Sequence, residues 1–501
     1  MRKIKFVDTT VRDGQQSLWA TGMHTEDVLA VMEHLDQGGF DAIEILATSF
    51  EKKMARELYQ CPFERLRLAH QLAPNTPLRV IRGRYLAAFQ ITPLAIERLW
   101  YQKLAEYGVR QVRSSDASNT VSSWKKQVDL GKEVGIDTIL NLVFSISPKH
   151  TDEYYAEKAR QAAKLGPFRI CLKDPGALLT PDRLQTLVPI IQENIGDVPL
   201  EFHTHCNTGL GSLCTLEAIN LGIDIVNTAI PPLAEGSSNP SVFEVARNAR
   251  VLGYETVLNE EPLHEVQAYL EQVAEQQGFA AGERLGYDSF HYIHQVPGGM
   301  ISNLRFQMQQ AGMGDRLDEV LEEIARVRAD FGYPIMVTPY SQFMGAQAVM
   351  NVLSSARYKV VSDELIQYAL GLWGEEESES MNPDVRDRIV NMPRAKAFVG
   401  KKYHEPEMAD LRKVYGGEGV SDDDFLLHFF TSREDVATLR ARQQKGVRHF
   451  TGQNSVLALI SKLSKYHNIS YVQLESSQQK IFLANTKKAG LVDQSSQEGI
   501  I

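Results

Sequence analysis

Short hydrophobic runs alternate with helical patterns over the first half of the chain. Each run is rich in β-branched and aromatic residues, which is typical of a buried strand. We predict strands at Ile4–Thr10, Asp41–Leu46, Leu78–Arg82, Val109–Ser115, Thr138–Ser145, Phe168–Lys173, Leu200–His205 and Ile225–Ile230. Glycines such as Gly108 and Gly135 stand between a helical stretch and the next run, where helix C-caps are expected. Eight such units in about 250 residues predict an α/β fold, the TIM (β/α)8 barrel.

The alternation stops after about Val251, and helical periodicity continues without strands. The later elements that we predict are helices at Glu260–Gln277, Asp315–Phe331 and Ser341–Leu353, a charged region around Asp384–Lys402, a linker or turn at Gly416–Asp423, a hairpin of Ile469–Leu474 with Lys480–Ala484, and a disordered tail at Gln494–Ile501. We therefore predict a catalytic barrel over residues 1–255, a helical extension over 256–430 that completes the active-site funnel, and a C-terminal helical and hairpin region over 431–501.

Composition and charge limit the classes of partner. The 501 residues carry a formal net charge of −10, which argues against nucleic acid or an anionic membrane as the main partner. The four cysteines, Cys61, Cys171, Cys206 and Cys214, form neither a CxxC pair nor a disulfide framework, as expected in a reducing compartment. The N-terminal segment has no apolar stretch typical of a signal peptide, and we expect a cytoplasmic protein that acts on a small molecule or a protein.

Polar side chains gather at the ends of the predicted strands, where TIM barrels carry their active sites. They are Asp8, Arg12, Asp13, Glu44, Arg82, Arg113, Asp116, Asn141, Lys173, Asp174, His203, His205, Asn227 and Thr228. A single residue of this kind is more often a cap or a turn former than a catalyst. Together they indicate an active site at the barrel mouth.

Two histidines stand two positions apart in Phe202-His-Thr-His205. On a strand they share a face and are close enough to bind one metal ion, although they could also line a polar barrel mouth. Asp13 follows the first strand and supplies a third ligand, and Arg12 and Gln16 can orient a carboxylate and a substrate oxygen. The alternative for Asp13 is a capped turn, which Asp-Gly often marks.

Lys173 ends a buried strand beside the histidine strand, where an uncompensated ammonium is costly. A nearby metal ion would require the lysine to be neutral or anionic. A neutral amine that adds carbon dioxide becomes a carbamate, which can bind a metal as a carboxylate does. A salt bridge to the neighbouring Asp174 is the alternative.

Arg82 and Arg113 end two adjacent predicted strands. Two arginines at one rim suit a substrate with one or two carboxylates, because the guanidinium binds a carboxylate through two parallel hydrogen bonds. Alternatively, each arginine pairs internally with Glu44 or Asp116.

Several motifs together resemble the carboxyltransferase domain of biotin-dependent enzymes, a family that includes pyruvate carboxylase, the oxaloacetate decarboxylase alpha subunit and the keto-acid subunit of transcarboxylase. The motifs are Arg12-Asp-Gly-Gln-Gln-Ser17, Ile81-Arg-Gly83, Val112-Arg-Ser-Ser-Asp-Ala-Ser-Asn119, Leu172-Lys-Asp-Pro-Gly-Ala-Leu-Leu179, His203-Thr-His205, Gln295-Val-Pro-Gly-Gly-Met-Ile-Ser-Asn303 and Val337-Thr-Pro-Tyr-Ser-Gln342. The resemblance covers nearly the whole chain. The first motif is also similar to metal-dependent aldol and Claisen enzymes.

The resemblance implies a role for each matched position. It implies a divalent metal (Zn, Mn or Co) held by Asp13, His203, His205 and a carbamylated Lys173. It also implies that Gln16 and Arg82 hold the 2-oxo acid and its enolate, and that Arg113 and Asp116 lie beside the substrate and biotin. Ser237 would supply the hydroxyl that carries a proton between substrate and biotin, and Arg12 would belong to the catalytic residues. The expected reaction moves a carboxyl group between carboxybiotin and a 2-oxo acid such as pyruvate or oxaloacetate.

No Ala-Met-Lys-Met biotin attachment motif occurs in the chain, so biotin is expected on a separate carrier protein or another carboxylase subunit. Relatives of this kind are commonly homodimers. A biotin-independent metal-dependent carbon–carbon lyase, decarboxylase or aldol/Claisen-type synthase is the second hypothesis, and an assembly subunit with a degenerate site is the third. The intact Asp-Lys-His-His set speaks against the third hypothesis.

Overall fold

The structure is a computed structural model, and it divides into two compact units, Met1–Val447 and Arg448–Ile501. It describes residues 2–87, 90–297, 304, 308–309, 312, 314–354, 356–374, 378–399, 405–417, 419–444, 471–475 and 480–484. Among these described residues, every helix is too short or too polar to cross a lipid bilayer.

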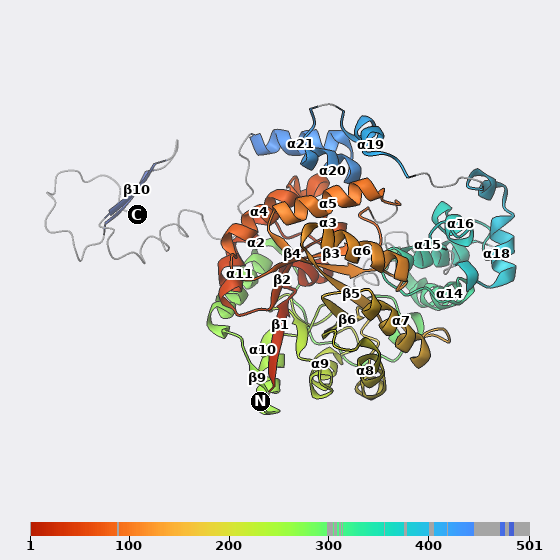
Figure 1. Ribbon diagram of the computed structural model, residues 1–501, viewed down its shortest axis with the longest axis horizontal. Coiled ribbons are helices and arrows are strands. Elements are labelled where there is room, and N and C mark those ends of the chain that lie inside the picture. The colour runs from red at the N-terminus through yellow and green to blue at the C-terminus, as the bar shows by residue number, and fades with distance from the viewer. Residues whose placement is uncertain are drawn as a thin grey trace. The chain divides into compact units, whose positions relative to one another are not determined.

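Eight parallel strands of the first unit close into a barrel (Figure 1). They are β1 (Lys3–Asp8), β2 (Ala42–Ala47), β3 (Leu78–Gly83), β4 (Val109–Ser115), β5 (Asp137–Val143), β6 (Arg169–Asp174), β7 (Leu200–Thr204) and β8 (Ile225–Thr228). They pair in sequence order, and β1 closes the ring by pairing with both β8 and β2. The predicted TIM barrel and each of its eight strands are confirmed.

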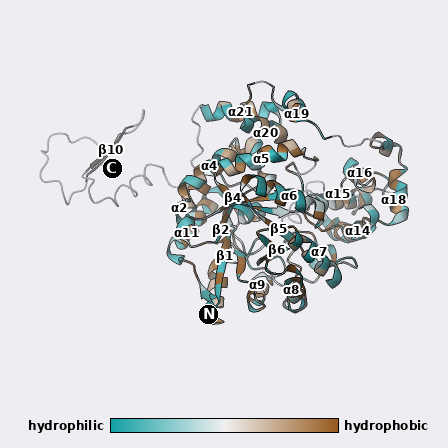
Figure 2. Cartoon of the chain, viewed as in Figure 1, coloured by the Kyte–Doolittle hydropathy of each residue, from teal (hydrophilic) through white to brown (hydrophobic). Residues whose placement is uncertain are grey.

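Helices surround the barrel, which explains why the strands read as continuous hydrophobic runs: both faces of each strand are covered. The helices are α1 (Gln15–Leu18), α2 (Thr25–Gln37), α3 (Thr48–Lys53), α4 (Pro62–Leu72), α5 (Leu94–Glu106), α6 (Val121–Val134), α7 (Asp152–Lys164), α8 (Pro181–Ile195), α9 (Gly211–Asn220) and α10 (Val242–Val251). Hydrophobic and hydrophilic segments alternate along them in Figure 2, as expected for helices that bury one face.

Strand β1 ends earlier than the predicted Thr10 because the backbone turns sharply after Asp8. The carbonyl oxygen of Thr9 accepts hydrogen bonds from the backbone N–H groups of Arg12, Asp13 and Gly14, at 3.2, 2.7 and 3.0 Å. Residues Thr10–Gly14 form a short π-helical turn, η1. This turn brings Asp13 over the barrel mouth. A short strand that the sequence pattern did not predict, β9 (Glu255–Thr256), pairs with the start of β1.

After α11 (Glu260–Gln277), whose Leu263, Val266 and Leu270 belong to the barrel core, helices of the first unit build a separate hydrophobic core around Ile324, Met344 and Leu365. The described helices here are α11, α12 (His291–His294), α14 (Leu317–Asp330), α15 (Tyr340–Leu353), α16 (Asp363–Ala369) and α18 (Pro383–Val390). The three helices predicted for this region correspond to α11, α14 and α15. The predicted charged region contains α18, and its last residues lie outside the described part of the chain.

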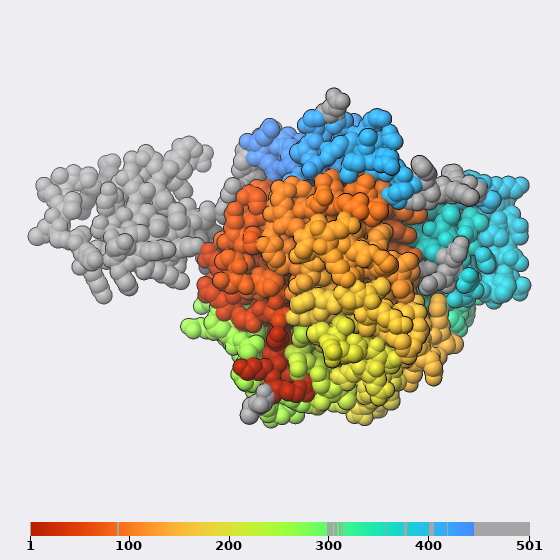
Figure 3. Space-filling view, in the orientation of Figure 1, coloured from red at the N-terminus to blue at the C-terminus, as the bar shows by residue number. Residues whose placement is uncertain are grey.

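The chain then returns to the barrel through α19 (Met408–Tyr415), α20 (Asp422–Phe430) and α21 (Arg433–Gln444). Phe425, Leu426 and Phe429 of α20 join the same hydrophobic core as the barrel strands. Figure 3 shows these C-terminal helices, in blue, directly against the orange N-terminal segments. The predicted turn at Gly416–Asp423 connects α19 to α20.

The described part of the second unit is an antiparallel hairpin of β10 (Tyr471–Glu475) and β11 (Lys480–Ala484), with Gln473 opposite Phe482. It confirms the predicted hairpin. The predicted disordered tail, Gln494–Ile501, lies outside the described residues.

Candidate active site at the barrel mouth

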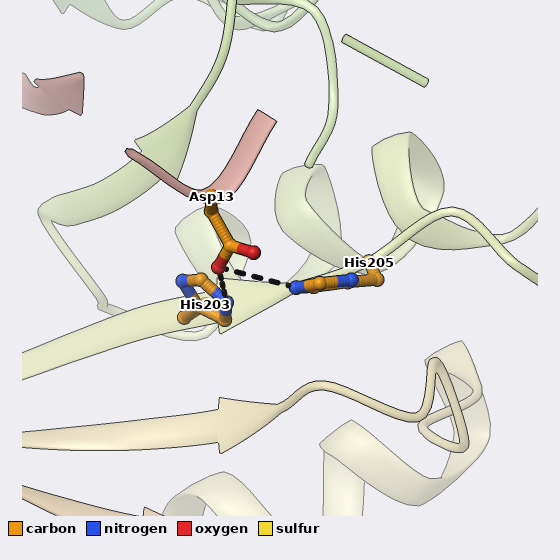
Figure 4. Close-up of side chains that lie close together, drawn as sticks. All are labelled: Asp13, His203 and His205. Atoms are coloured by element: carbon orange, nitrogen blue, oxygen red, sulfur yellow. Dashed lines mark hydrogen bonds and ion pairs between the residues drawn. The ribbon is translucent and has the colours of Figure 1, made fainter. Parts of the chain in front are cut away.

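Asp13, His203 and His205 converge at the carboxyl end of the barrel strands (Figure 4). One carboxylate oxygen of Asp13, Oδ2, lies 3.2 Å from Nε2 of His203 and 3.3 Å from Nε2 of His205. All three side chains are buried, and their potential ligand atoms lie within 4.8 Å of one another. The alternation of β7 makes this possible, because residues two apart point to the same side of a strand.

The Asp13 carboxylate is held in its ionised form. Burial alone would raise its pKa, but the guanidinium of Arg12, 2.8 Å away, holds the pKa well below its usual range. Arg12 is itself buried and also pairs with Glu44 of β2. The sequence predicted that Arg12 can orient a carboxylate, and it contacts two, those of Asp13 and Glu44.

His203 is neutral, because burial and the nearby Arg113 guanidinium lower its pKa to about 3. Its Nδ1 lies 2.8 Å from the side-chain oxygen of Asn227 and 3.3 Å from a nitrogen of Arg113. The shorter contact decides the tautomer: Nδ1–H donates to Asn227, whose own amide is oriented by donating to Glu201 at 2.8 Å. The lone pair of Nε2 therefore faces Asp13.

The His205 ring also turns Nε2 toward Asp13, but a different partner accepts the hydrogen bond from its Nδ1–H. Its Nδ1–H donates to the backbone carbonyl of Ser237 at 2.7 Å, since a carbonyl can only accept. The hydroxyl of Ser237 donates to the carbonyl of Ser17 at 3.0 Å, and the hydroxyl of Ser17 lies 3.2 Å from Oδ1 of Asp13. Ser237 thus links the turn that carries Asp13 to His205, which directly follows β7.

These side chains fit a divalent cation. Two imidazole lone pairs and one carboxylate point at a common position, while the other nitrogen of each ring is committed to a neighbouring oxygen. Nitrogen and oxygen donors in this combination are the usual ligands of a catalytic zinc or a similar ion. The described residues therefore form a possible metal site.

Lys173 lies on β6 directly beside His203 in the strand register, so both side chains occupy the same level of the barrel. Burial, together with the charges of Arg113 and Arg12, lowers the pKa of its ammonium to about 7. Its Nζ donates to the hydroxyl of Ser115 at 3.1 Å. The amine therefore loses its proton much more readily than that of an ordinary lysine.

The alternative salt bridge from Lys173 to Asp174 is not formed. Asp174 instead accepts hydrogen bonds from the backbone N–H groups of Leu178 and Leu179, both at 2.8 Å. It therefore fixes the loop after β6. Adjacent residues on a strand point to opposite faces, which separates the two side chains.

Arg113 lies inside the barrel below the histidines and belongs to a buried ion-pair network. Its guanidinium lies 3.0 Å from Glu44 and donates to Asn227. Glu201 accepts two hydrogen bonds from Arg79, at 2.6 and 3.0 Å. The internal pairing of Arg113 with Glu44, which the sequence left open, is therefore present, and this network supports Asn227 and His203 from below.

Arg82 is not brought together with this group. Its guanidinium pairs at 2.6 Å with Glu97 of α5 and donates to the carbonyls of Gly83 and Arg84, toward the outer helices. Asp116 follows β4 and accepts a hydrogen bond from the backbone of Ser118 at 2.8 Å.

Gln16 lies on α1 one turn after Asp13 and is partly exposed. Glu201 and Ser17 were absent from the predicted site, since neither stands at a strand end. Asn227 was noted only as a polar strand end, and its orienting hydrogen bond could not be read from its position.

Comparison with known proteins agrees with the resemblance of the motifs. The family model described as a conserved carboxylase domain matches residues 292–490, and the model described as HMGL-like matches residues 3–270. A pyruvate carboxylase subunit from Methanocaldococcus jannaschii is 37% identical over 391 residues, which cover 77% of this chain and 68% of that protein. The chain belongs to the carboxyltransferase family of biotin-dependent enzymes.

Other members of this carboxyltransferase family differ in the substrates that their names give. The methylmalonyl-CoA carboxyltransferase 5S subunit of Propionibacterium freudenreichii is 30% identical over 440 residues, covering 87% of this chain and 85% of that one. The 2-oxoglutarate carboxylase large subunit of Hydrogenobacter thermophilus is 29% identical over 450 residues, covering 86% and 69%. The solved carboxyl transferase domain of Rhizobium etli pyruvate carboxylase with pyruvate shares the fold, with a TM-score of 0.79, 24% identity, and coverage of 88% and 78%.

Proposed function

We propose that this protein moves a carboxyl group between carboxybiotin, presented by a separate carrier protein, and a 2-oxo acid, at a divalent metal held by Asp13, His203 and His205. The observation that carries the proposal is the arrangement of the two imidazoles: each donates its Nδ1–H to a neighbouring oxygen and turns Nε2 toward Asp13. Membership in the carboxyltransferase family supports the reaction class.

The residues of the site have distinct tasks in this reaction. A divalent cation, when bound, would supply positive charge near the oxygen on which the enolate of the 2-oxo acid develops. Arg12 keeps Asp13 ionised, and Asn227 and Ser237 keep the two imidazoles in the tautomer that can bind a cation. These groups are held before any ligand arrives, so little reorganisation is needed during the reaction.

The proposed transfer breaks the bond between the carboxyl carbon and a ring nitrogen of biotin and forms a bond from that carbon to the enolate carbon. The proton that leaves the 2-oxo acid passes to biotin, and we propose the hydroxyl of Ser237 as its carrier. Ser237 is partly exposed and lies in the loop after β8, and its backbone carbonyl accepts the hydrogen bond from His205. A Ser237→Ala variant retains the backbone carbonyl that His205 needs. We expect it to lose transfer activity while it still binds metal, with any loss of affinity limited to that of the hydrogen bond to Ser17.

We further propose that Lys173 is carbamylated and completes the metal ligands. Its neutral nitrogen attacks the carbon of carbon dioxide, a nitrogen–carbon bond forms, and one proton is released, which leaves an anion. The position of Lys173 beside His203 and its lowered pKa support this step. The mass of the intact folded protein should exceed the sequence mass by one carbon dioxide, and Lys173→Ala should remove that increment together with metal binding or activity.

The substrate is proposed as a 2-oxo acid, since relatives are named for pyruvate and 2-oxoglutarate. We propose Gln16, which lies on α1 one turn after Asp13, as a ligand to the acid. Arg113 and Arg82 are already paired with carboxylates, so direct contact with the substrate would require each to leave Glu44 or Glu97. Their substrate role, like that of Asp116, stays a prediction, as do the homodimer and the cytoplasmic location.

The test is decarboxylation of oxaloacetate by the purified protein, measured with and without free biotin, together with analysis of bound metal. We expect biotin to stimulate turnover. Equal turnover without biotin would instead support the metal-dependent lyase hypothesis, for which the HMGL-like match over residues 3–270 provides a basis. Absence of bound metal would contradict both hypotheses. Pyruvate and 2-oxoglutarate, supplied with a carboxylated carrier, would then identify the acid.

A further inference from the structure

The segment Phe279–Phe290, which connects α11 to α12, crosses the loops that carry the site without forming a helix or a strand. We call it the strap. Most side chains of the strap between Glu283 and Ser289 are exposed, so its contacts with the barrel are made largely by the backbone. At its start, Phe279 stacks on Trp19 at 4.8 Å, and the indole of Trp19 donates to the carbonyl of Ala280 at 2.9 Å.

The strap is packed most tightly at Gly282, against the loop that follows β8. The backbone N–H of Gly282 donates to the carbonyl of Pro232 at 2.8 Å. A Cβ atom at Gly282 would lie 1.8 Å from the carbonyl oxygen of Ala234, far inside contact distance. Only glycine permits this approach of two backbones.

Two further glycines, on the barrel side, extend the same contact. A Cβ atom at Gly236 would lie 3.3 Å from the carbonyl oxygen of Glu283, and one at Gly209 would lie 2.4 Å from that of Leu285. Gly236 directly precedes Ser237, whose carbonyl holds His205. The strap therefore packs against the backbone directly before Ser237, whose hydrogen bond orients His205, a proposed metal ligand.

We propose that Gly282 is a positioning residue for the metal centre. Because it lets the strap pack closely against residues 232–236, it fixes the position of the Ser237 carbonyl and therefore the orientation of the His205 ring. The inference rests on the proposed metal-dependent function. A methyl group at position 282 must displace either the strap or this loop. Displacing the loop would lengthen the contact from Ser237 to His205, and loss of such an orienting contact typically lowers metal affinity about tenfold or more.

The strap provides a matched control. Gly286 lies on the same segment, has no neighbour among the described residues within 4 Å of the point that a Cβ atom would occupy, and, like Gly282, does not have a positive φ. Gly282→Ala and Gly286→Ala therefore make the same chemical change, with the same small effect on the unfolded chain, and differ in the collision with Ala234.

The experiment titrates Co²⁺ into the metal-stripped wild-type protein and both variants, recording the dissociation constant, the visible absorption of the bound ion, and the thermal unfolding of each metal-free protein. We expect Gly282→Ala to bind Co²⁺ about tenfold more weakly than Gly286→Ala, with an altered absorption spectrum. Equal affinities and spectra for the two variants would overturn the inference. Failure of the wild-type protein to bind Co²⁺ would instead refute the proposed metal function, and this inference with it.

A second variant decides the question if Gly282→Ala does not fold. Trp19→Phe keeps an aromatic ring against Phe279 and removes the N–H that donates to Ala280, which loosens the start of the strap. We expect weaker Co²⁺ binding than in the wild-type protein. Unchanged affinity in folded Trp19→Phe would overturn the inference.

Discussion

Asn227→Ala tests whether the site is organised to bind a metal. The side-chain oxygen of Asn227 accepts the Nδ1–H of His203 at 2.8 Å, and its amide nitrogen donates to Glu201 at 2.8 Å. Removing such an orienting partner typically lowers metal affinity by about 10- to 100-fold, which corresponds to roughly 1.4–2.7 kcal/mol. The Nδ1–H of His203 loses its acceptor, which costs about 1–3 kcal/mol of folding free energy, whereas Arg113 and Glu201 keep Glu44 and Arg79 as partners.

Because both effects are expected, affinity is measured on folded protein, by competition of Zn²⁺ between the metal-stripped variant and a chelator. Asn141→Ala is the control: Asn141 is an equally buried asparagine of β5, and its amide has no hydrogen-bond partner among the described residues. Asn141→Ala removes the same volume and none of the hydrogen bonds described for His203. Equal Zn²⁺ affinities of Asn227→Ala and Asn141→Ala would show that Asn227 does not orient His203 for metal binding.

Three further predictions concern stability. Glu201→Gln removes the charge that Arg79 pairs with inside the barrel, and should lower the free energy of unfolding by about 3–5 kcal/mol in urea titrations; an unchanged midpoint would refute the role of this network. Burial raises the pKa of Glu51 well above its usual value, so Glu51 destabilises the folded protein increasingly as the pH rises above the pKa of the carboxyl in the unfolded chain. Glu51→Gln should therefore raise the melting temperature at pH 8 more than at pH 5, and equal shifts at the two pH values would contradict this. Burial lowers the pKa of Lys173 from 10.5 to about 7, so in the metal-free protein Lys173 destabilises the fold fully below pH 7 and less and less as the pH rises toward 10.5. Lys173→Met should therefore raise the melting temperature most near pH 6. A difference in melting temperature between variant and wild type that does not change with pH would exclude a buried neutral amine.

The sequence predicted the barrel well because its strands are covered on both faces. Runs such as Arg169–Asp174 are buried throughout, so hydrophobic residues stand at consecutive positions and each run is easily recognised. Helix α11 was predicted with its observed bounds, because its apolar face follows helical periodicity over 18 residues.

It was harder to predict whether an individual strand residue points into the barrel or toward the outer helices. Arg79 and Arg82 belong to the same strand, yet Arg79 pairs with Glu201 inside the barrel and Arg82 with Glu97 of an outer helix. A shift of one residue reverses the face, and a strand end located to within one or two residues cannot fix it. The separation of Lys173 from Asp174 has the same origin.

Contacts made by the backbone could not be inferred from residue types. His205 is oriented by the carbonyl of Ser237, whereas the sequence pointed to the hydroxyl of that residue. The strap is recognised by the close approach of Gly282 to Ala234, and these positions are 48 residues apart with no motif joining them. Such contacts depend on how loops after different strands meet, which local periodicity does not encode.

Metal removal tests whether carboxyl transfer takes place at a metal held by Asp13, His203 and His205. The protein is stripped with a chelator, and biotin-stimulated oxaloacetate decarboxylation is measured before stripping, after stripping, and after adding Zn²⁺, Mn²⁺ or Co²⁺. We predict that stripping abolishes the stimulated activity, that at least one of these ions restores it, and that His203→Ala cannot be restored. Full activity in the metal-free protein would contradict the account.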